Sequence, residues 1–378
     1  MSLIATRIQD WRIQVPKFDE NMHRVGTYGA LDLFVSQTEA ADSFITPELR
    51  NRAIQSIGTN IDIPVIDYNG NVTVSNVRSC TIEDAENTSA LYRVVFATYA
   101  VGFTQTPVLY HNNDIGYARD FNAKMTAHIS ALAKTLDVAA IAALETNKTQ
   151  VFGDKLFYDE SANTLGVKWD YRENFMGDIP VLFNANDYSF GDIHLVSNSG
   201  IESNIRKMAE WGANNSQNKQ LQYADKFFHF TNNLTNEDSV FATAFAVRGN
   251  QLGYLTRSGR ENLARTRSND TEWDIVNMPI LNMPVDTYYY TDKGDKSTLA
   301  GEASSDMNCV ITEHFGFWID VAFIVKYNSD PDIVANPIIK FEVLNSDCDN
   351  WMAAPVKTVC GAGSSQTNPL YTQAVTAP

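Results

Sequence analysis

The residues that could perform chemistry are scattered along the sequence. The six histidines form no HxH or HExxH motif and none stands beside a cysteine pair, so no metal site is indicated. These histidines are His23, His111, His128, His194, His229 and His314. No GxSxG elbow, Walker loop or GxGxxG after a strand occurs. The run CGAGSS (360–365) places a cysteine and serines beside glycines, but without a nearby histidine or aspartate a flexible tail is favoured. The sequence predicts no enzyme and no cofactor.

The charged clusters are better explained as surface contacts than as binding sites. Alternating carboxylates in DKGDK (292–296) and DCDN (347–350) lack the spacing and terminal glutamate of a calcium loop, which favours solvated turns. For the basic run at 257–267, a contact with an acidic neighbour or an ordinary surface helix is favoured over a phosphate site. The polar run EDAENTSA (83–90) is interpreted as an exposed acidic loop tip. The candidate contact residues are Glu83, Asp84 and Glu86 of this tip and Arg257, Arg260, Arg265 and Arg267 of the basic run.

The composition indicates an acidic, globular and soluble chain. Of its 378 residues 44% are hydrophobic, which is enough to bury a core. The formal net charge of −16 argues against sequence-specific nucleic-acid binding, which needs lysine and arginine to neutralise phosphates. No signal peptide and no run of ~18 apolar residues is present. The four scattered cysteines are interpreted as reduced thiols, with a bridge between Cys348 and Cys360 as the alternative.

One very long helix is predicted between residues 112 and 148. This stretch has no proline, and its one glycine, Gly116, lies in the first turn. Asn112 or Asn113 can cap the start, and at 1.5 Å per residue the helix would be ~50 Å long. Apolar residues recur every three or four positions, which indicates one buried helical face. They are Ile115, Ala118, Phe121, Met125, Ile129, Leu132, Leu136, Ala140 and Leu144.

The region before this helix is predicted to contain an arm and a ribbon. Residues 1–55 are interpreted as an extended arm, apart from a short helix capped by Thr46. The pattern from Ile61 onward is typical of strands, with Asn69-Gly70 as a hairpin signal. We interpret residues 70–105 as a long two-stranded ribbon ending in the acidic tip. Because a lone ribbon is marginally stable in water, it is a candidate intersubunit element.

The region after the helix is predicted to change from mixed to β structure. Residues 165–270 combine strand and helix patterns, and residues 271–345 return to long β-branched and aromatic runs. The remaining tail is polar and typical of loops.

This order of elements resembles the major capsid protein of tailed double-stranded DNA bacteriophages, which has the Hong Kong 97-type fold. Three runs carry the resemblance. YARDFNAKMTAHISALAKTLDVAAIAALETNKTQVF (117–152) is similar to the spine helix, VRSCTIEDAENTSALYRVVFATYAVGF (77–103) to the extended loop, and HFGFWIDVAFIVKYN (314–328) to the returning peripheral strand.

The resemblance implies an α+β fold with an N-terminal arm, an extended β-hairpin loop, a spine helix, and peripheral and axial domains. The implied divisions are 1–55 for the arm, 56–110 for the extended loop, 111–165 for the peripheral domain with the spine helix, 166–270 for the axial domain, 271–345 for the return to the peripheral sheet and 346–378 for the C-terminal segment.

The implied function is structural. Copies of the chain would assemble, as hexamers and pentamers, into the icosahedral shell of a virion, built in the bacterial host cytoplasm around double-stranded DNA held without sequence specificity. The implied partners are further copies, the portal, scaffolding and a cement or decoration protein. Since the arm follows Met1 at once, scaffolding is expected to be a separate protein. Deleting residues 1–45 is expected to abolish shells and leave a folded core.

The resemblance also implies a way of locking the shell that this chain lacks. The family's best-known member forms isopeptide bonds from a lysine of the extended loop to an asparagine of a neighbour. Here no lysine occurs between Lys17 and Lys124, so the loop has no amine for this bond. Non-covalent contacts are expected instead.

Three alternatives remain open at this point. An encapsulin shares the fold and encloses protein cargo. A phage tail or baseplate protein is another acidic, β-rich assembly protein, although the spine helix argues against it. A cellular enzyme of mixed α/β class is the third, and the sequence offers it no site.

Overall fold

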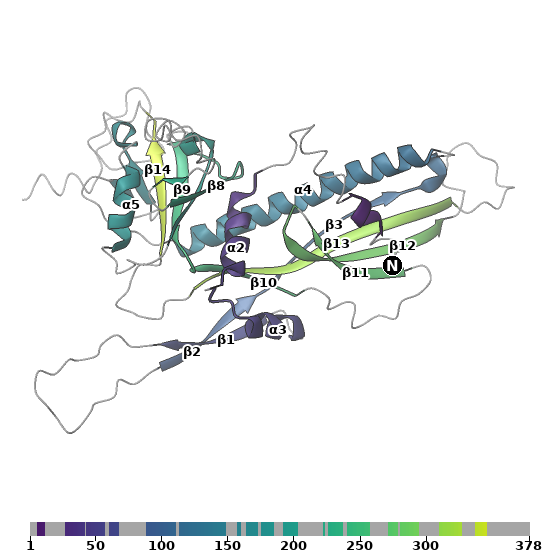
Figure 1. Ribbon diagram of the computed structural model, residues 1–378, viewed down its shortest axis with the longest axis horizontal. Helices are drawn as coiled ribbons and strands as arrows, with labels where there is room; N and C mark the ends of the chain where they lie inside the picture. Colours follow the sequence, from purple (N-terminus) through teal and green to yellow (C-terminus); the bar gives the residue numbers. More distant parts are fainter. Residues whose placement is uncertain are drawn as a thin grey trace, which may run out of the picture.

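A computed structural model describes most of the elements that the sequence predicts. The described residues are 6–11, 27–41, 43–56, 60–67, 88–110, 113–148, 157–159, 164–172, 175–184, 192–202, 222–223, 226–236, 240–257, 271–278, 280–294, 310–326 and 337–345. Within them the strands form a two-stranded ribbon, a five-stranded sheet and a seven-stranded sheet. Helix α4 runs along the molecule and reaches both larger sheets (Figure 1).

Helix α4 (Asp114–Asn147) confirms the long helix, with 34 residues. The Asn113 side chain caps its start, because its Oδ1 accepts a hydrogen bond from the Gly116 N–H at 2.9 Å. Ile115 is 71% exposed and Ala118 is only partly buried, so the first of the predicted residues to be fully covered is Phe121. The predicted residues that are buried are Phe121, Met125, Ile129, Leu132, Leu136, Ala140 and Leu144.

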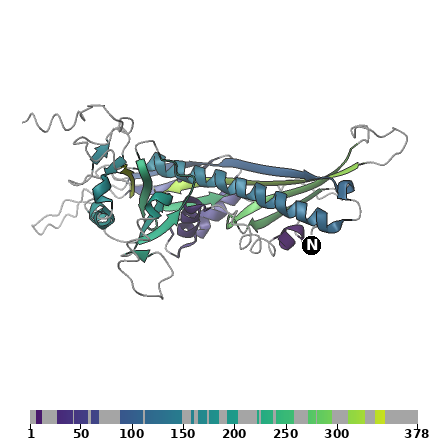
Figure 2. The same cartoon turned by 90° about the horizontal axis from the view of Figure 1, so that it is seen from above.

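By length and composition alone, residues 115–147 would also suit a membrane-spanning helix. The structure accounts for these apolar residues differently, since they pack against the two sheets. From Phe121 to Leu136 they contact the five-stranded sheet, and Ala140 and Leu144 join a cluster with the seven-stranded sheet. Figure 2 shows α4 lying along the length of the molecule from above. Helix α4 therefore connects the five-stranded sheet to the seven-stranded sheet.

The five-stranded sheet is antiparallel and is built around the longest strand. It contains β3 (Ala97–Gln105), β10 (Leu252–Thr256), β11 (Thr271–Met278), β12 (Met283–Gly294) and β13 (Val310–Val325). Strand β13 pairs with β3, β12 and β10, and β11 adds to β12. Alternate residues of β13, including Phe315, Phe317 and Ile319, are buried in the cluster beneath α4. The 3-10 turn η1 (Pro107–Tyr110) connects β3 to the helix.

The ribbon differs from its prediction in register and extent. Strand β1 (Asn60–Asp67) pairs with β2 (Thr88–Val95), while β3 leaves the ribbon and joins β13. The long strand run is broken at Phe96, because Phe103 and its neighbours bury beneath α4 rather than in the ribbon. Residues 68–87, which include Asn69-Gly70 and most of the acidic tip, lie outside the described residues. Helix α3 (Pro47–Gln55), capped by Thr46 as predicted, packs at the base of the ribbon.

The seven-stranded sheet has the order β4, β5, β14, β9, β6, β8, β7. Its strands are β4 (Phe157–Asp159), β5 (Thr164–Val167), β6 (Ile193–Ser197), β7 (Gln222–Tyr223), β8 (Lys226–Phe230), β9 (Val240–Arg248) and β14 (Ile338–Leu344). The 3-10 turn η2 (Trp169–Tyr171) precedes helix α5 (Phe175–Asn184). Helix α5 packs against one face of this sheet through Phe175, Ile179 and Phe183.

Two strands lie in a different sheet from the one that the sequence divisions imply. Strand β14 was expected to return to the sheet of β13, but it pairs with β9 and β5. Its residues are buried on both faces, with Ile338 in one cluster and Phe341 in another, so it requires a central position. Strand β10, from the middle of the chain, pairs instead with β13.

The N-terminal region is not an extended arm where the structure describes it. Residues 6–11 are helical, and Trp11 is fully buried with its Nε1 donating to Thr126 Oγ1 of α4 at 3.0 Å. Helix α2 (Gly29–Glu39) packs against α4, β6, β8 and β10. Its residues Leu31, Leu33 and Phe34 have no exposed surface. Helix α2 therefore forms part of the subunit core rather than an arm that leaves the subunit.

Candidate assembly surface

The predicted basic contact is only partly within the described residues, and that part is buried. Arg257 is 2% exposed. Its Nη2 donates to the Ser56 carbonyl oxygen at 2.7 Å, and its guanidinium lies 4.7 Å from the centre of the Phe96 ring. Arg257 therefore fixes the base of the ribbon within its own subunit, and its burial leaves little of its surface for the contact with a neighbour that the sequence predicts. The positions of Glu83, Asp84, Glu86, Arg260, Arg265 and Arg267 lie outside the described residues.

The ribbon carries an apolar inner face that anchors it to the body. Val94 and Phe96 are 4% and 8% exposed and pack with Ile61. The same cluster includes Ala53 of α3 and Leu255 of β10. Because side chains alternate between the faces of a strand, the residues between these buried ones point away from the body.

The outer face of the ribbon is exposed and carries two large apolar side chains. Leu91 is 71% and Val95 is 65% exposed, and Arg93 lies between them in the strand. Arg93 Nε donates to Asp62 Oδ1 of β1 at 2.9 Å, and this hydrogen bond holds the pKa of Asp62 below its ordinary value. An ion pair this exposed contributes little to stability. Two large apolar side chains around one cross-strand ion pair therefore form the outer ribbon surface. The alternation in LYRVV could have predicted this face.

The far end of α4 is tied to the seven-stranded sheet by charges. Lys340 of β14 lies 3.2 Å from Glu145 of α4 and 3.1 Å from Glu342. Lys148, the residue that follows the helix, forms a further ion pair with Glu145. Burial alone would raise the pKa of Glu145, but the two lysines outweigh it and lower that pKa. Since Lys340 and Glu342 are largely buried, this network holds the helix end on the sheet.

The described histidines contact neighbouring side chains or backbone groups of the fold. His194 and His229, predicted to stand alone, meet across β6 and β8 with 3.2 Å between Nδ1 and Nε2. Burial and the neighbouring ring lower the pKa of His229 to about 4. His128 bonds the Lys124 carbonyl, and His314 stacks on a tyrosine. In the described part of the chain, no group of three or more His, Cys, Asp or Glu side chains could hold a metal ion. His23 and His111 lie outside it.

The comparisons with known proteins give structural neighbours only. No protein-family model matches the sequence, and no curated protein matches it. The chain is similar to a solved structure from Mycobacterium phage Che8, at 10% identity and a TM-score of 0.48 over 82% of this chain and 90% of that one. It is similar to the capsid of Ralstonia phage GP4, at 9% identity and 0.45 over 85% and 92%. A third is the cyanophage Pam1 capsid asymmetric unit, at 11% identity and 0.45 over 78% and 87%.

Proposed function

We propose that this chain is the major capsid protein of a tailed double-stranded DNA bacteriophage. Its role is to form the virion shell by self-assembly. The observation that carries the proposal is the combination of one helix bridging two sheets with a ribbon whose outer face exposes two large apolar side chains. A stiff helix suits a flat tile, and the ribbon offers the tile a contact for its neighbour.

We assign the parts of a capsid subunit to the described elements. Helix α4 is the spine, the five-stranded sheet belongs to the peripheral domain and the seven-stranded sheet to the axial domain. The paired strands β1 and β2 are the extended loop. This assignment keeps the order implied by the resemblance, but it places β10 in the peripheral domain and β14 in the axial domain.

The charge of the chain is consistent with a container for DNA. A net charge of −16 disfavours tight binding to phosphates, so the shell encloses the genome without binding it tightly. Portal, scaffolding and cement proteins are further partners in this proposal, as is assembly in the host cytoplasm. The shell has no catalytic task.

The decisive experiment is negative-stain electron microscopy of the purified full-length chain, alone and as particles from infected cells. Closed shells that hold DNA in the infected-cell preparation support the proposal. Shells that hold only protein cargo would indicate an encapsulin, and a chain that stays monomeric with no particles in either preparation would overturn it.

The outer ribbon face provides a matched test. Leu91→Ser should sharply reduce shell yield, because the exposed leucine buries against a neighbour, while the free energy of unfolding of the free subunit changes by less than about 0.5 kcal/mol. Val181→Ser on α5, at a residue that is also well exposed, is the control and should leave the yield unchanged. Equal yields from both variants would show that the ribbon face is not an assembly contact.

A further inference from the structure

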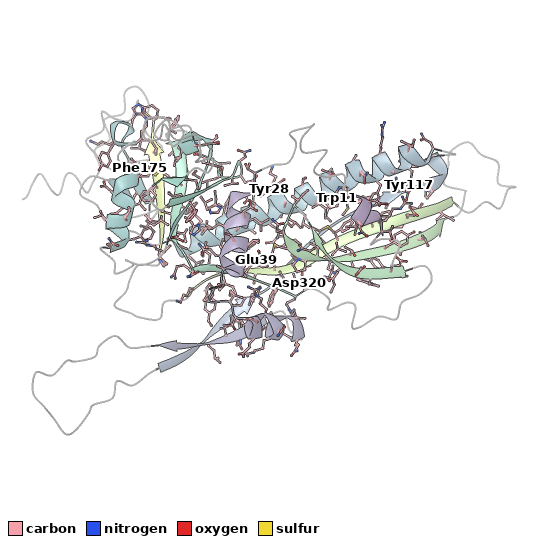
Figure 3. All side chains as sticks on the ribbon, viewed as in Figure 1. Trp11, Tyr28, Glu39, Tyr117, Phe175 and Asp320 are labelled. Carbon is pink, nitrogen blue, oxygen red and sulfur yellow. The ribbon has the colours of Figure 1, made fainter. Side chains whose placement is uncertain are left out.

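Helix α2 lies where the two sheets meet. Tyr28, just before the helix, forms a β-bridge with Thr231 after β8, and its hydroxyl donates to the Ser130 carbonyl of α4 at 3.1 Å. Figure 3 labels Tyr28 at one end of α2 and Glu39 at the other. Gly29 packs so closely on the Phe230 backbone that a Cβ would lie 2.5 Å from its oxygen. The start of α2 is thereby held on the seven-stranded sheet.

The other end of α2 holds the five-stranded sheet. Gln37 Oε1 accepts a hydrogen bond from the Leu252 N–H at 2.9 Å, and Thr38 Oγ1 accepts one from the Tyr254 N–H at 2.9 Å. Both donors belong to β10. A single helix of 11 residues therefore touches both sheets and α4, as a wedge at their junction.

One buried carboxylate fastens this wedge to α4. Asp137 has no exposed surface, and its Oδ1 accepts a hydrogen bond from the Leu31 N–H at 3.0 Å. Its Oδ2 accepts from Thr231 Oγ1 at 2.5 Å and from Asn233 Nδ2 at 2.8 Å. The residue lies between Leu136, which packs with the five-stranded sheet, and Ala140, which packs with the seven-stranded sheet.

The contact with α2 also completes that helix. The first N–H groups of a helix lack partners within it, and the residue before α2, Tyr28, provides no side-chain cap. The Asp137 carboxylate accepts from one of these groups, at the end of the helix where a negative charge is favoured. A cap is usually supplied by the chain just before the helix, whereas here it comes from a residue 106 positions away.

Because of these hydrogen bonds, moving α2 or residues 231–233 away from α4 is energetically unfavourable. A buried carboxylate is tolerated only while hydrogen-bond donors compensate it. Here the donors come from α2 and from residues 231–233, so movement of either segment leaves the charge short of partners. An intermediate angle between the two sheets is therefore disfavoured.

We propose that Asp137 fixes the two sheets in one relative orientation, because its hydrogen bonds hold α2 and residues 231–233 against α4. It is a positioning residue. Resting on the proposed function, we further infer that the junction stays rigid in the shell, and that differences in curvature between subunits are taken up outside it.

The test compares variants of the full-length chain by amide hydrogen exchange. Asp137→Ala removes the acceptor, and Asn233→Ala removes one of its donors. Thr126→Ala is the control, because it removes the hydrogen bond between Trp11 and α4, which lies on the side of the five-stranded sheet. In Asp137→Ala, exchange should accelerate about tenfold or more in α2 and residues 231–236 but not in β12, β13 or β9. Asn233→Ala should give a smaller acceleration in the same segments, and Thr126→Ala none.

Two results would overturn the proposal. One is exchange in α2 that is no faster in the Asp137 and Asn233 variants than in Thr126→Ala, and the other is acceleration spread evenly over both sheets. If Asp137→Ala fails to fold, the comparison of Asn233→Ala with Thr126→Ala decides. Particle diameters provide a second readout, because a looser junction should broaden their distribution in Asn233→Ala. A parent chain that forms no particles would remove the proposed function and leave the exchange result standing.

Discussion

At the scale of single residues, the junction contains a second carboxylate that the fold does not favour. Asp32 follows Leu31 in the first turn of α2. Partial burial of its carboxyl group, with the nearby Asp137 charge, raises the pKa of Asp32 to about 6, although the residue as a whole is exposed to solvent. A carboxylate in the first helical turn is usually stabilising, so the direction of this shift is a distinctive property of the junction.

Asp32→Asn should therefore stabilise the protein at neutral pH. A carboxyl whose pKa is raised in the fold binds its proton more tightly there than in the unfolded chain, where its pKa is 3.8, so stability falls as the pH rises from 3.8 to about 6 and levels off above that. The variant should melt at a higher temperature than the parent at pH 7.5, and the difference should shrink as the pH falls below about 6 and vanish below 3.8. Thermal melts across this range provide the measurement, and a variant less stable at pH 7.5 would contradict the assignment.

At the scale of elements, α4 is the part on which both sheets depend. Its buried stripe contacts the five-stranded sheet first and the seven-stranded sheet second. The N-terminal segments also rest on it, through Trp11 and Tyr28. Deleting residues 1–45 would remove α2 together with its buried leucines and phenylalanine. We therefore expect that deletion to unfold the subunit, in contrast to the intact core that an extended arm predicts.

Leu132→Pro should abolish soluble, assembled protein. Proline at this mid-helix position removes a backbone hydrogen bond and clashes with the preceding turn, at a cost of about 3 kcal/mol or more. Leu132 is only 3% exposed, so Leu132→Met is the matched control that preserves volume and should cost less than about 1.5 kcal/mol. Soluble yield and particle counts measure the outcome, and normal particles from the proline variant would refute the role of α4.

At the scale of the whole molecule, the proposed shell is expected to be held by non-covalent contacts at the ribbon. The described ribbon strands contain no lysine, and neither does the rest of the sequence between Lys17 and Lys124. This loop therefore cannot supply the amine of an isopeptide bond. The exposed face with Leu91 and Val95 offers apolar area instead, and repetition over many identical contacts allows small contributions to favour assembly.

Particles boiled in detergent should release one species. Without covalent bonds between subunits, denaturing electrophoresis should give a single band at the chain mass of 42.1 kDa. A parallel sample treated with an amine-reactive crosslinker provides the ladder for comparison. The same ladder in the untreated sample would show a covalent lock formed by other residues.

Local patterns in the sequence determined the elements of this protein. The 3.6-residue period between Phe121 and Leu144 predicted a helix and its buried face, because burial on one side of a helix imposes that spacing. Thr46 and Asn113 were predictable as caps for a similar reason, since a cap depends on adjacent residues.

Tertiary structure decided which elements are partners. At Phe96 the strand run divides, so that β2 pairs with β1 in the ribbon and β3 pairs with β13 in the five-stranded sheet. Strand β14 pairs with β9 in the seven-stranded sheet. These pairings depend on strands that lie far apart in the chain. The burial of Arg257 beside Ser56 has the same origin. So has Asp137, whose sequence neighbours do not distinguish it from a solvent-exposed helical aspartate. Its donors come from residues 106, 94 and 96 positions away, and only the folded chain brings them together.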